Sequence, residues 1–272
     1  METVIRIFSK VINGINKVKR YLIFYLKTYH FDAQKYTGTH VGTNRMNDVE
    51  LQKAPEVIYI LWTGNNEFTP NRKKGLDSII NSTGVDVVLV SPGNIYDYVL
   101  EDFPLHKAYK YLSLVHRSDY LRCYLMLHHG GGYADIKIFN KSWKNAFRML
   151  NASNDKWCVG YHERSWCGVA ETEGVLGRDL VDNYLYLMSN GAYIFRPGNP
   201  ISLECMHEIH RRLDELYINL KDNPATDYFG ENKNYSVPWS YIGGHILHPL
   251  ELKYHDKIIH IEELRPLNEA YR

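Results

Sequence analysis

The sequence predicts an α/β domain in which a β-sheet is flanked by helices. A continuous apolar run of strand-forming residues, 57–62, and a second strand-forming run, 85–90, enclose a helical pattern at residues 70–81. Each run stops at a turn, which is typical of a strand buried in a parallel sheet. The order strand, helix, strand indicates a right-handed crossover unit. With 272 residues, of which 44% are hydrophobic, the chain is long enough to bury one such core.

The chain before this unit has two parts. Residues 4–26 carry apolar side chains near helical spacing, with Lys and Arg between them. This pattern predicts an amphipathic helix, which either lies on an anionic membrane surface or packs on the domain or on a second chain as a self-association surface. Residues 28–54 are polar and mixed, as expected of a linker. We therefore assign 1–54 to an N-terminal extension and 55–272 to the main domain.

The later elements follow from the same patterns. Residues 105–116 form a helical stretch, and residues 200–218 place apolar side chains along one helical face. Short apolar runs at 157–161 and 192–195 predict strands, and a third follows a stretch rich in Pro, Gly and His, at 257–261. The chain contains no internal repeat, so we expect one domain after the extension.

Bulk composition limits the classes of partner. The net charge of +1 does not favour nucleic acid or an acidic polymer as a partner. Four cysteines without a C-x-x-C pair indicate a reducing compartment and no disulfide framework. No apolar stretch is long enough to cross a bilayer, and the N-terminus lacks a signal-peptide cleavage site. We therefore expect a cytoplasmic protein, peripheral at a membrane surface if the N-terminal helix binds lipid.

The most informative segment is a helix followed by a glycine turn. It reads Ser118-Asp119-Tyr120-Leu121-Arg122, and Gly130-Gly131-Gly132 follows after an apolar stretch. Ser118 is suited to cap a helix that starts at Asp119, and Gly130 is suited to end it in a left-handed conformation. Asp119 and Arg122 would then share one face in the first turn, where the helix N-terminus favours anions. Taken alone, this pair is equally consistent with a local ion pair on a solvated helix face.

A strand is predicted directly after the glycines. Its residues alternate between two faces, so Tyr133, Asp135 and Lys137 project one way while Ile136 faces the core. An acid and a base are therefore placed side by side next to the Asp119–Arg122 helix. By itself this pair is a weak signal, because neighbouring charges on an edge strand are common.

Together these residues resemble the core motif of GT-A glycosyltransferases of the capsular polysaccharide, yeast mannosyltransferase and clostridial glucosylating-toxin groups. That motif is Ser-Asp-x-x-Arg, then Gly-Gly-x-Tyr, then Asp-x-Asp. The resemblance covers roughly residues 55–250. Outside the central motif it rests on three segments: 55–64, Ser189-Asn190-Gly191-Ala192, and Pro238-Trp239-Ser240 through Pro249. It implies a GT-A fold, a Rossmann-like mixed sheet that binds a nucleotide sugar, flanked by helices.

The resemblance also implies an activity and a set of roles. The protein would transfer a sugar from a UDP- or GDP-sugar donor to a hydroxyl of a glycan acceptor, with retention of anomeric configuration. Asp119 and Arg122 would hold the donor sugar, and Asp135 would contact ribose or sugar hydroxyls. The catalytic set would be Asp119, Arg122, Asp135 and Lys137. The substrate-binding set would be Trp62 on the base, Tyr133, Asn190 near the transferred sugar, Trp239 and Ser240 over the diphosphate, and His248.

Lys137 departs from the family pattern, in which the last Asp of the triplet binds Mn²⁺ or Mg²⁺. A protonated Lys cannot ligate a cation. We therefore expect the Lys137 ammonium to support the leaving diphosphate in place of the ion, with no metal cofactor. The alternative is a metal-dependent enzyme that binds Mn²⁺ or Mg²⁺ through Asp135, His245 and His248.

A third interpretation belongs to another class. The missing Asp would then mark an inactive relative that only binds a glycan or a protein partner. The polar residues of the motif argue against it, because buried polar groups cost stability unless they are partnered. The sequence names no nucleophile, and the acids Glu163, Glu171 and Asp227 are the candidates near the acceptor.

Overall fold

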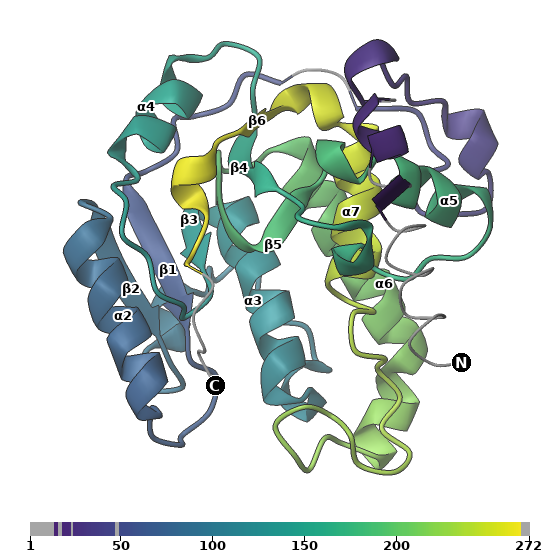
Figure 1. Cartoon of the computed structure of the whole chain (residues 1–272). Helices are drawn as coiled ribbons and strands as arrows, with labels where there is room; N and C mark the ends of the chain where they lie inside the picture. Colours follow the sequence, from purple (N-terminus) through teal and green to yellow (C-terminus); the bar gives the residue numbers. More distant parts are fainter. Residues whose placement is uncertain (1–13, 16–17, 23, 47–48, 268–272) are drawn as a thin grey trace, which may run out of the picture.

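The computed structural model describes residues 14–15, 18–22, 24–46 and 49–267. Within them, one six-stranded mixed sheet in the order β2-β1-β3-β5-β4-β6 is flanked by helices on both faces (Figure 1). The predicted fold class is therefore confirmed. The strands are β1 (Val57–Leu61), β2 (Asp86–Val90), β3 (Gly131–Ala134), β4 (Cys158–His162), β5 (Met188–Phe195) and β6 (Ile258–His260). The helices are α2 (Pro70–Ser82), α3 (Leu114–His128), α4 (Lys144–Ala152), α5 (Gly174–Asp182), α6 (Pro200–Asp222) and α7 (Gly244–Lys253).

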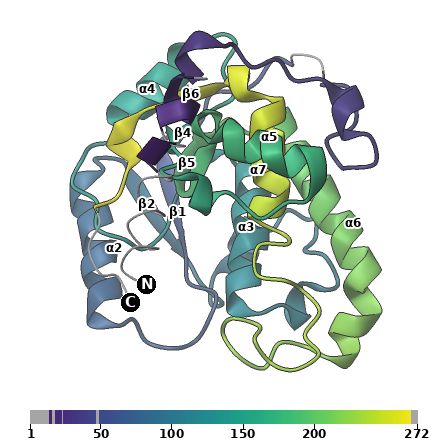
Figure 2. The same cartoon turned by 45° about the vertical axis from the view of Figure 1, so that its right-hand side comes forward.

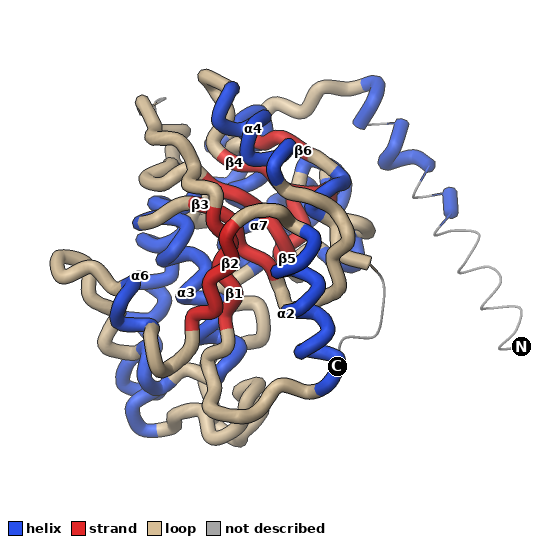
Figure 3. Tube along the Cα trace, turned by 90° about the vertical axis from the view of Figure 1, so that its left-hand side faces the viewer, coloured by secondary structure: helices blue, strands red, loops and turns tan. Residues whose placement is uncertain are grey.

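The strand directions bring several strand ends to one edge of the sheet. Strands β1, β2 and β3 are parallel, while β5 runs antiparallel to both of its neighbours, β3 and β4. The carboxyl ends of β1 and β3 and the start of β5 consequently lie at the same edge. Figure 3 shows the strands as one twisted layer between the helices.

Alternating residues of the strands feed two separate apolar cores. Tyr59 and Leu61 of β1 pack on the side covered by α3, α5, α6 and α7, whereas Ile58 and Ile60 face α2 and α4. Figure 2 shows the same division, with α2 and α4 on one side of the sheet. The period-two pattern that predicted the strands thus also decides which helices cover each face.

Helix ends follow the local chemistry of the sequence. The Thr69 and Asn199 side chains cap α2 and α6, and Pro70 and Pro200 occupy the first helical position of each. Gly130 follows α3 at φ +65°, as predicted.

Several boundaries differ from the prediction. Residues 105–113 are not α-helical: Tyr109–Tyr111 form a short 3-10 turn, and α3 begins only at Leu114. The ring of His106 accepts the Ala108 N–H at 3.1 Å, so this segment finds hydrogen-bond partners outside a helix. Strand β2 is a half-buried edge strand rather than a fully buried one.

Helix α7 was missed by the sequence analysis. Its Gly, His and Pro content indicated a loop, and Pro249 lies inside it. Residues 246–253 are nevertheless buried, so tertiary packing overrides the local preference.

The segment predicted as a linker packs on the domain. Tyr36 and Val41 are fully buried in the larger core, and the Tyr36 hydroxyl donates to Asp179 Oδ2 at 2.7 Å. The division of the chain at residue 54 stays a prediction.

Across the described residues, no helix has both the length and the apolar character needed to cross a membrane.

We expect Gly130→Ala to destabilise the fold more than Gly198→Ala. Gly130 has a φ of +65° and Gly198 a φ of +69°. An alanine in this left-handed conformation lowers the stability by about 1 kcal/mol. At position 130 a Cβ would also lie 2.5 Å from Pro197 Cδ, whereas nothing lies within 4 Å at position 198. The clash adds roughly 1–3 kcal/mol. Urea unfolding measures both losses, and equal losses would contradict the packing described here.

Candidate active site

A cavity of about 740 Å³ opens at the carboxyl ends of β1 and β3. This edge is where α/β sheets bind ligands. Nine residues that the sequence analysis predicted for the site line it: Trp62, Asp119, Arg122, Tyr133, Asp135, Asn190, Trp239, Ser240 and His248. Lys137 adjoins the cavity through its ion pair with Asp135, whereas His245 is not among the lining residues. The structure brings these residues together, and their roles stay predictions.

The centre of the cavity wall is an ion pair on α3. Asp119 and Arg122 lie three residues apart and contact one another directly, and their side chains are 9% and 14% exposed. Arg122 Nη1 also donates to the Asn190 carbonyl of β5 at 3.1 Å. Burial raises the pKa of Asp119, and the Arg122 charge opposes that rise. The guanidinium therefore helps to keep the buried carboxylate ionised.

The predicted helix N-terminus at Asp119 is wrong. Helix α3 is capped by the Ser113 side chain, which accepts the His116 N–H, so Asp119 lies in the second turn and Ser118 is no cap. The N-termini of α2, α3 and α7 reach the cavity, since Thr69, Leu114 and Gly244 line its wall. The favourable field for an anion thus comes from these helix starts rather than from a helix start at Asp119.

Asp135 and Lys137 are adjacent, but not because of strand alternation. Strand β3 ends at Ala134, and the chain bends over the next residues. Lys137 Nζ lies 2.8 Å from Asp135 Oδ2, while the Tyr133 hydroxyl donates to Asp135 Oδ1 at 2.8 Å. Both carboxylate oxygens are held in place, so Asp135 presents a fixed acceptor to the cavity.

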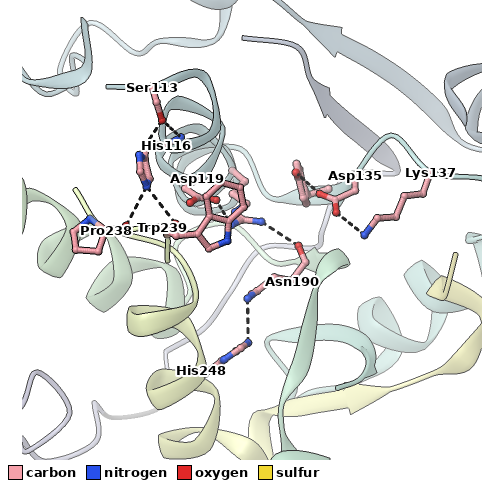
Figure 4. Close-up of polar contacts among 11 residues, drawn as sticks. Ser113, His116, Asp119, Asp135, Lys137, Asn190, Pro238, Trp239 and His248 are labelled. Atoms are coloured by element: carbon pink, nitrogen blue, oxygen red, sulfur yellow. Dashed lines mark hydrogen bonds and ion pairs between the residues drawn. The ribbon is translucent and has the colours of Figure 1, made fainter. Parts of the chain in front are cut away.

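His248 fixes the side chain of Asn190. The Ala170 N–H donates to His248 Nδ1 at 3.0 Å, so the neutral ring carries its proton on Nε2 and donates there. Nε2 lies 3.0 Å from the Asn190 amide (Figure 4). Two facing nitrogens would both donate, and therefore the amide oxygen belongs on the His248 side. The amide NH₂ then takes the other position, which is buried without a partner among the described residues.

The metal alternative lacks a ligand set in this arrangement. Among the described residues, no group of three or more His, Cys, Asp or Glu side chains could hold an ion. Both Asp135 oxygens and both ring nitrogens of His248 are already engaged, and His245 does not line the cavity. These residues therefore do not fit the predicted metal site as they stand.

His116 was missed and positions one side of the cavity. Its ring is fully buried, and Nε2 lies 3.1 Å from the Pro238 carbonyl and 3.2 Å from the Trp239 carbonyl (Figure 4). Facing two acceptors, Nε2 must carry the proton, so Nδ1 accepts from the hydroxyls of Ser113 and Tyr235 at 2.9 Å. His116 thereby ties the Trp239 loop to α3. The sequence offered only its spacing from Ser113 as a signal.

Arg72 and two aromatic residues were also missed. Arg72 lines the cavity from the first turn of α2 and donates to the Ile136 carbonyl at 3.0 Å. A basic residue in the first turn of a helix opposes the helix dipole, and this position is the sequence signal that could have identified Arg72. Tyr228 and Phe229 line the rim beside Trp239, and all three are exposed.

The three candidate acids lie in different surroundings. Glu171 lines the cavity. Glu163 is buried, its pKa is raised by that burial, and its carboxylate accepts the Arg164 N–H at 2.7 Å. Asp227 accepts the backbone N–H groups of residues 229–231, so it shapes its own loop.

Comparison with known proteins adds one match. Residues 13–164, more than half of the chain, match the model of a family described as capsular polysaccharide synthesis protein. The match includes the Asp119–Arg122 helix and the Asp135–Lys137 bend. No curated protein matches the chain.

We expect His248 to make the folded protein less stable as the pH is lowered. Burial, together with Arg122 and His245, lowers its pKa to about 4, against about 6.5 in an unfolded chain. Below pH 6.5 the unfolded chain therefore binds a proton that the folded chain does not, and stability decreases towards pH 4. The free energy of unfolding of the wild type should therefore decrease between pH 7.5 and pH 5. His248→Gln should make that decrease smaller by roughly 2 kcal/mol.

Urea unfolding at the two pH values measures this difference. His30→Gln, at an exposed histidine, is the matched control and should leave the pH dependence of stability unchanged. An unchanged slope in His248→Gln would show that the ring is not held neutral in the fold.

Proposed function

The chain belongs to the capsular polysaccharide synthesis protein family, and from this premise we propose that it is a glycosyltransferase. The reaction would move a sugar from a UDP- or GDP-sugar to a hydroxyl of a glycan, with retention of configuration. The observation that carries the proposal is the buried Asp119–Arg122 pair beside Asp135 on one cavity wall. Fixed carboxylates suit sugar hydroxyls, and a fixed guanidinium suits phosphate.

The base-binding end of the cavity is proposed at Trp62. Its indole stacks on Phe68 with ring centroids 4.3 Å apart, and Nε1 donates to the Asn66 carbonyl at 2.7 Å. These contacts hold the ring rigidly at the cavity wall, so it offers a preformed stacking surface for a nucleobase.

Positive groups on the wall would support the leaving diphosphate. Arg122 and the N-terminus of α7 favour an anion, and the Lys137 ammonium lies beside Asp135 at the same edge. We propose that Lys137 supplies the electrostatic support for which relatives with Asp-x-Asp use a cation. Asp135 would keep the ammonium oriented, and Asn190, which lines the cavity, would lie close to the transferred sugar.

The acceptor would enter past the aromatic rim of Tyr228, Phe229 and Trp239. Exposed aromatic rings at a cavity mouth are typical of surfaces that contact a ligand. If the transfer inverts configuration instead, Glu171 is the acid on the wall from which a general base would be drawn.

We expect wild-type turnover to survive EDTA. Lys137→Met should lower kcat roughly 10²–10³-fold, the usual effect of removing one transition-state donor. Lys137→Asp should regain turnover only with Mn²⁺, because two carboxylates then face the diphosphate. A nucleotide-sugar turnover panel with and without EDTA measures this. The exposed Lys141→Met is the control, and loss of wild-type activity in EDTA that Mn²⁺ restores would refute metal independence.

Cys167 provides a test of donor binding that does not require turnover. It is exposed and lines the cavity, whereas Cys123, Cys158 and Cys205 are buried. A bound nucleotide sugar should slow its alkylation by N-ethylmaleimide by up to about tenfold at a ligand concentration ten times Kd. Mass spectrometry of the labelled chain measures the rate. Unchanged labelling with every nucleotide sugar would favour the inactive glycan- or partner-binding alternative.

A further inference from the structure

The N-terminal arm, the described residues between positions 14 and 27, is not used by the proposed function. Its helical pieces, 18–22 and 24–26, project from the body of the domain (Figure 3). They have one side that contacts the domain and one that does not.

The inner side of the arm is set by Arg20 and Phe24. Arg20 Nε lies 3.3 Å from Asp182 Oδ1, and its guanidinium lies 4.7 Å above the ring of Trp166. The ring of Phe24 lies 4.7 Å from that of Tyr186. These contacts mark the side of the arm that faces the domain.

The outer side of the arm is apolar and exposed. Ile15 is 63% exposed, Val18 60%, Leu22 53% and Leu26 81%. Within the described helical piece 18–22, at about 100° per residue, Val18 and Leu22 lie about 40° apart on the side opposite Arg20. An apolar stripe held away from its own domain needs another partner.

The charge of the segment favours lipid over a second copy of the chain. Residues 1–27 contain six Lys or Arg and a single Glu. Lys19 and Lys27 are exposed within the arm itself. Two copies of such a segment would repel each other, whereas an anionic bilayer attracts each basic residue and accepts the apolar stripe.

We propose that the N-terminal arm is a membrane-binding element that lies in the interface of an anionic bilayer. Ile15, Val18, Leu22 and Leu26 enter the acyl boundary, and the Lys side chains stay with the headgroups. Trp166, which Arg20 contacts, precedes Cys167 and Gly168 on the cavity wall. Binding through the arm therefore holds the cavity close to the membrane surface.

Co-sedimentation of the full chain with vesicles tests this proposal. The chain should bind vesicles of equal parts phosphatidylglycerol and phosphatidylcholine, and bind pure phosphatidylcholine much more weakly. Leu22→Ser with Leu26→Ser should lower the partition constant at least about tenfold, because two inserted side chains are lost. Lys19→Gln with Lys27→Gln should lower it by about tenfold or more on the anionic vesicles alone.

Ile80→Ser with Ile218→Ser is the matched control. Those side chains are 52% and 64% exposed but lie on α2 and α6, so vesicle binding should not change. No preference for anionic vesicles, or equal binding by the Leu22/Leu26 variant and the wild type, would overturn the proposal. Self-association abolished by the same Leu variant, without vesicle binding, would assign the stripe to a second copy instead; sedimentation velocity measures that outcome.

Discussion

The buried contact between Asp119 and Arg122 organises the cavity. Either charge alone would be strongly destabilising at this depth, so the two side chains must stay together. Arg122 extends the contact to β5 by donating to the Asn190 carbonyl. The pair also leaves little room for a side chain directly before α7, because a Cβ at Gly243 would lie 3.0 Å from Asp119 Oδ2. One ion pair thus fixes a helix, a strand and the start of a second helix relative to one another.

Asn190 connects this pair to the other side of the site. Its carbonyl accepts from Arg122, and its amide contacts His248, which in turn accepts from the Ala170 N–H. A continuous chain of contacts therefore runs from α3 through β5 to α7 and the loop that carries Ala170. These contacts hold the Asn190 side chain in one orientation beside the cavity, whose wall it lines.

The sequence predicted those features that depend on local periodicity. The apolar run of β1, the turn at Gly130 and the apolar face of α6 each follow from neighbouring residues, and the structure confirms them. The start of α3 was misplaced because Ser113 and Ser118 are both acceptable caps, and only the contacts of His116 with residues 235–239 distinguish them. Helix α7 was missed because its stability comes from burial on all sides. The grouping of distant residues around one cavity was predicted through the family resemblance, whereas His116 and Arg72 bear on the site through backbone carbonyls that no sequence pattern reveals.

The arm and the cavity are linked by the short segment between β4 and α5. Arg20 packs on Trp166 at one end of that segment, while Cys167 and Glu171 line the cavity further along it. If a glycan acceptor is attached to a membrane, a transferase gains by having its cavity at the surface, because encounter is then confined to two dimensions and the effective acceptor concentration rises. An enzyme acting on a free glycan gains nothing from such placement. The outward apolar stripe of the arm, and its contact with the segment whose later residues line the cavity, therefore favour a membrane-attached acceptor. This argument depends neither on the identity of the sugar nor on the role of Lys137.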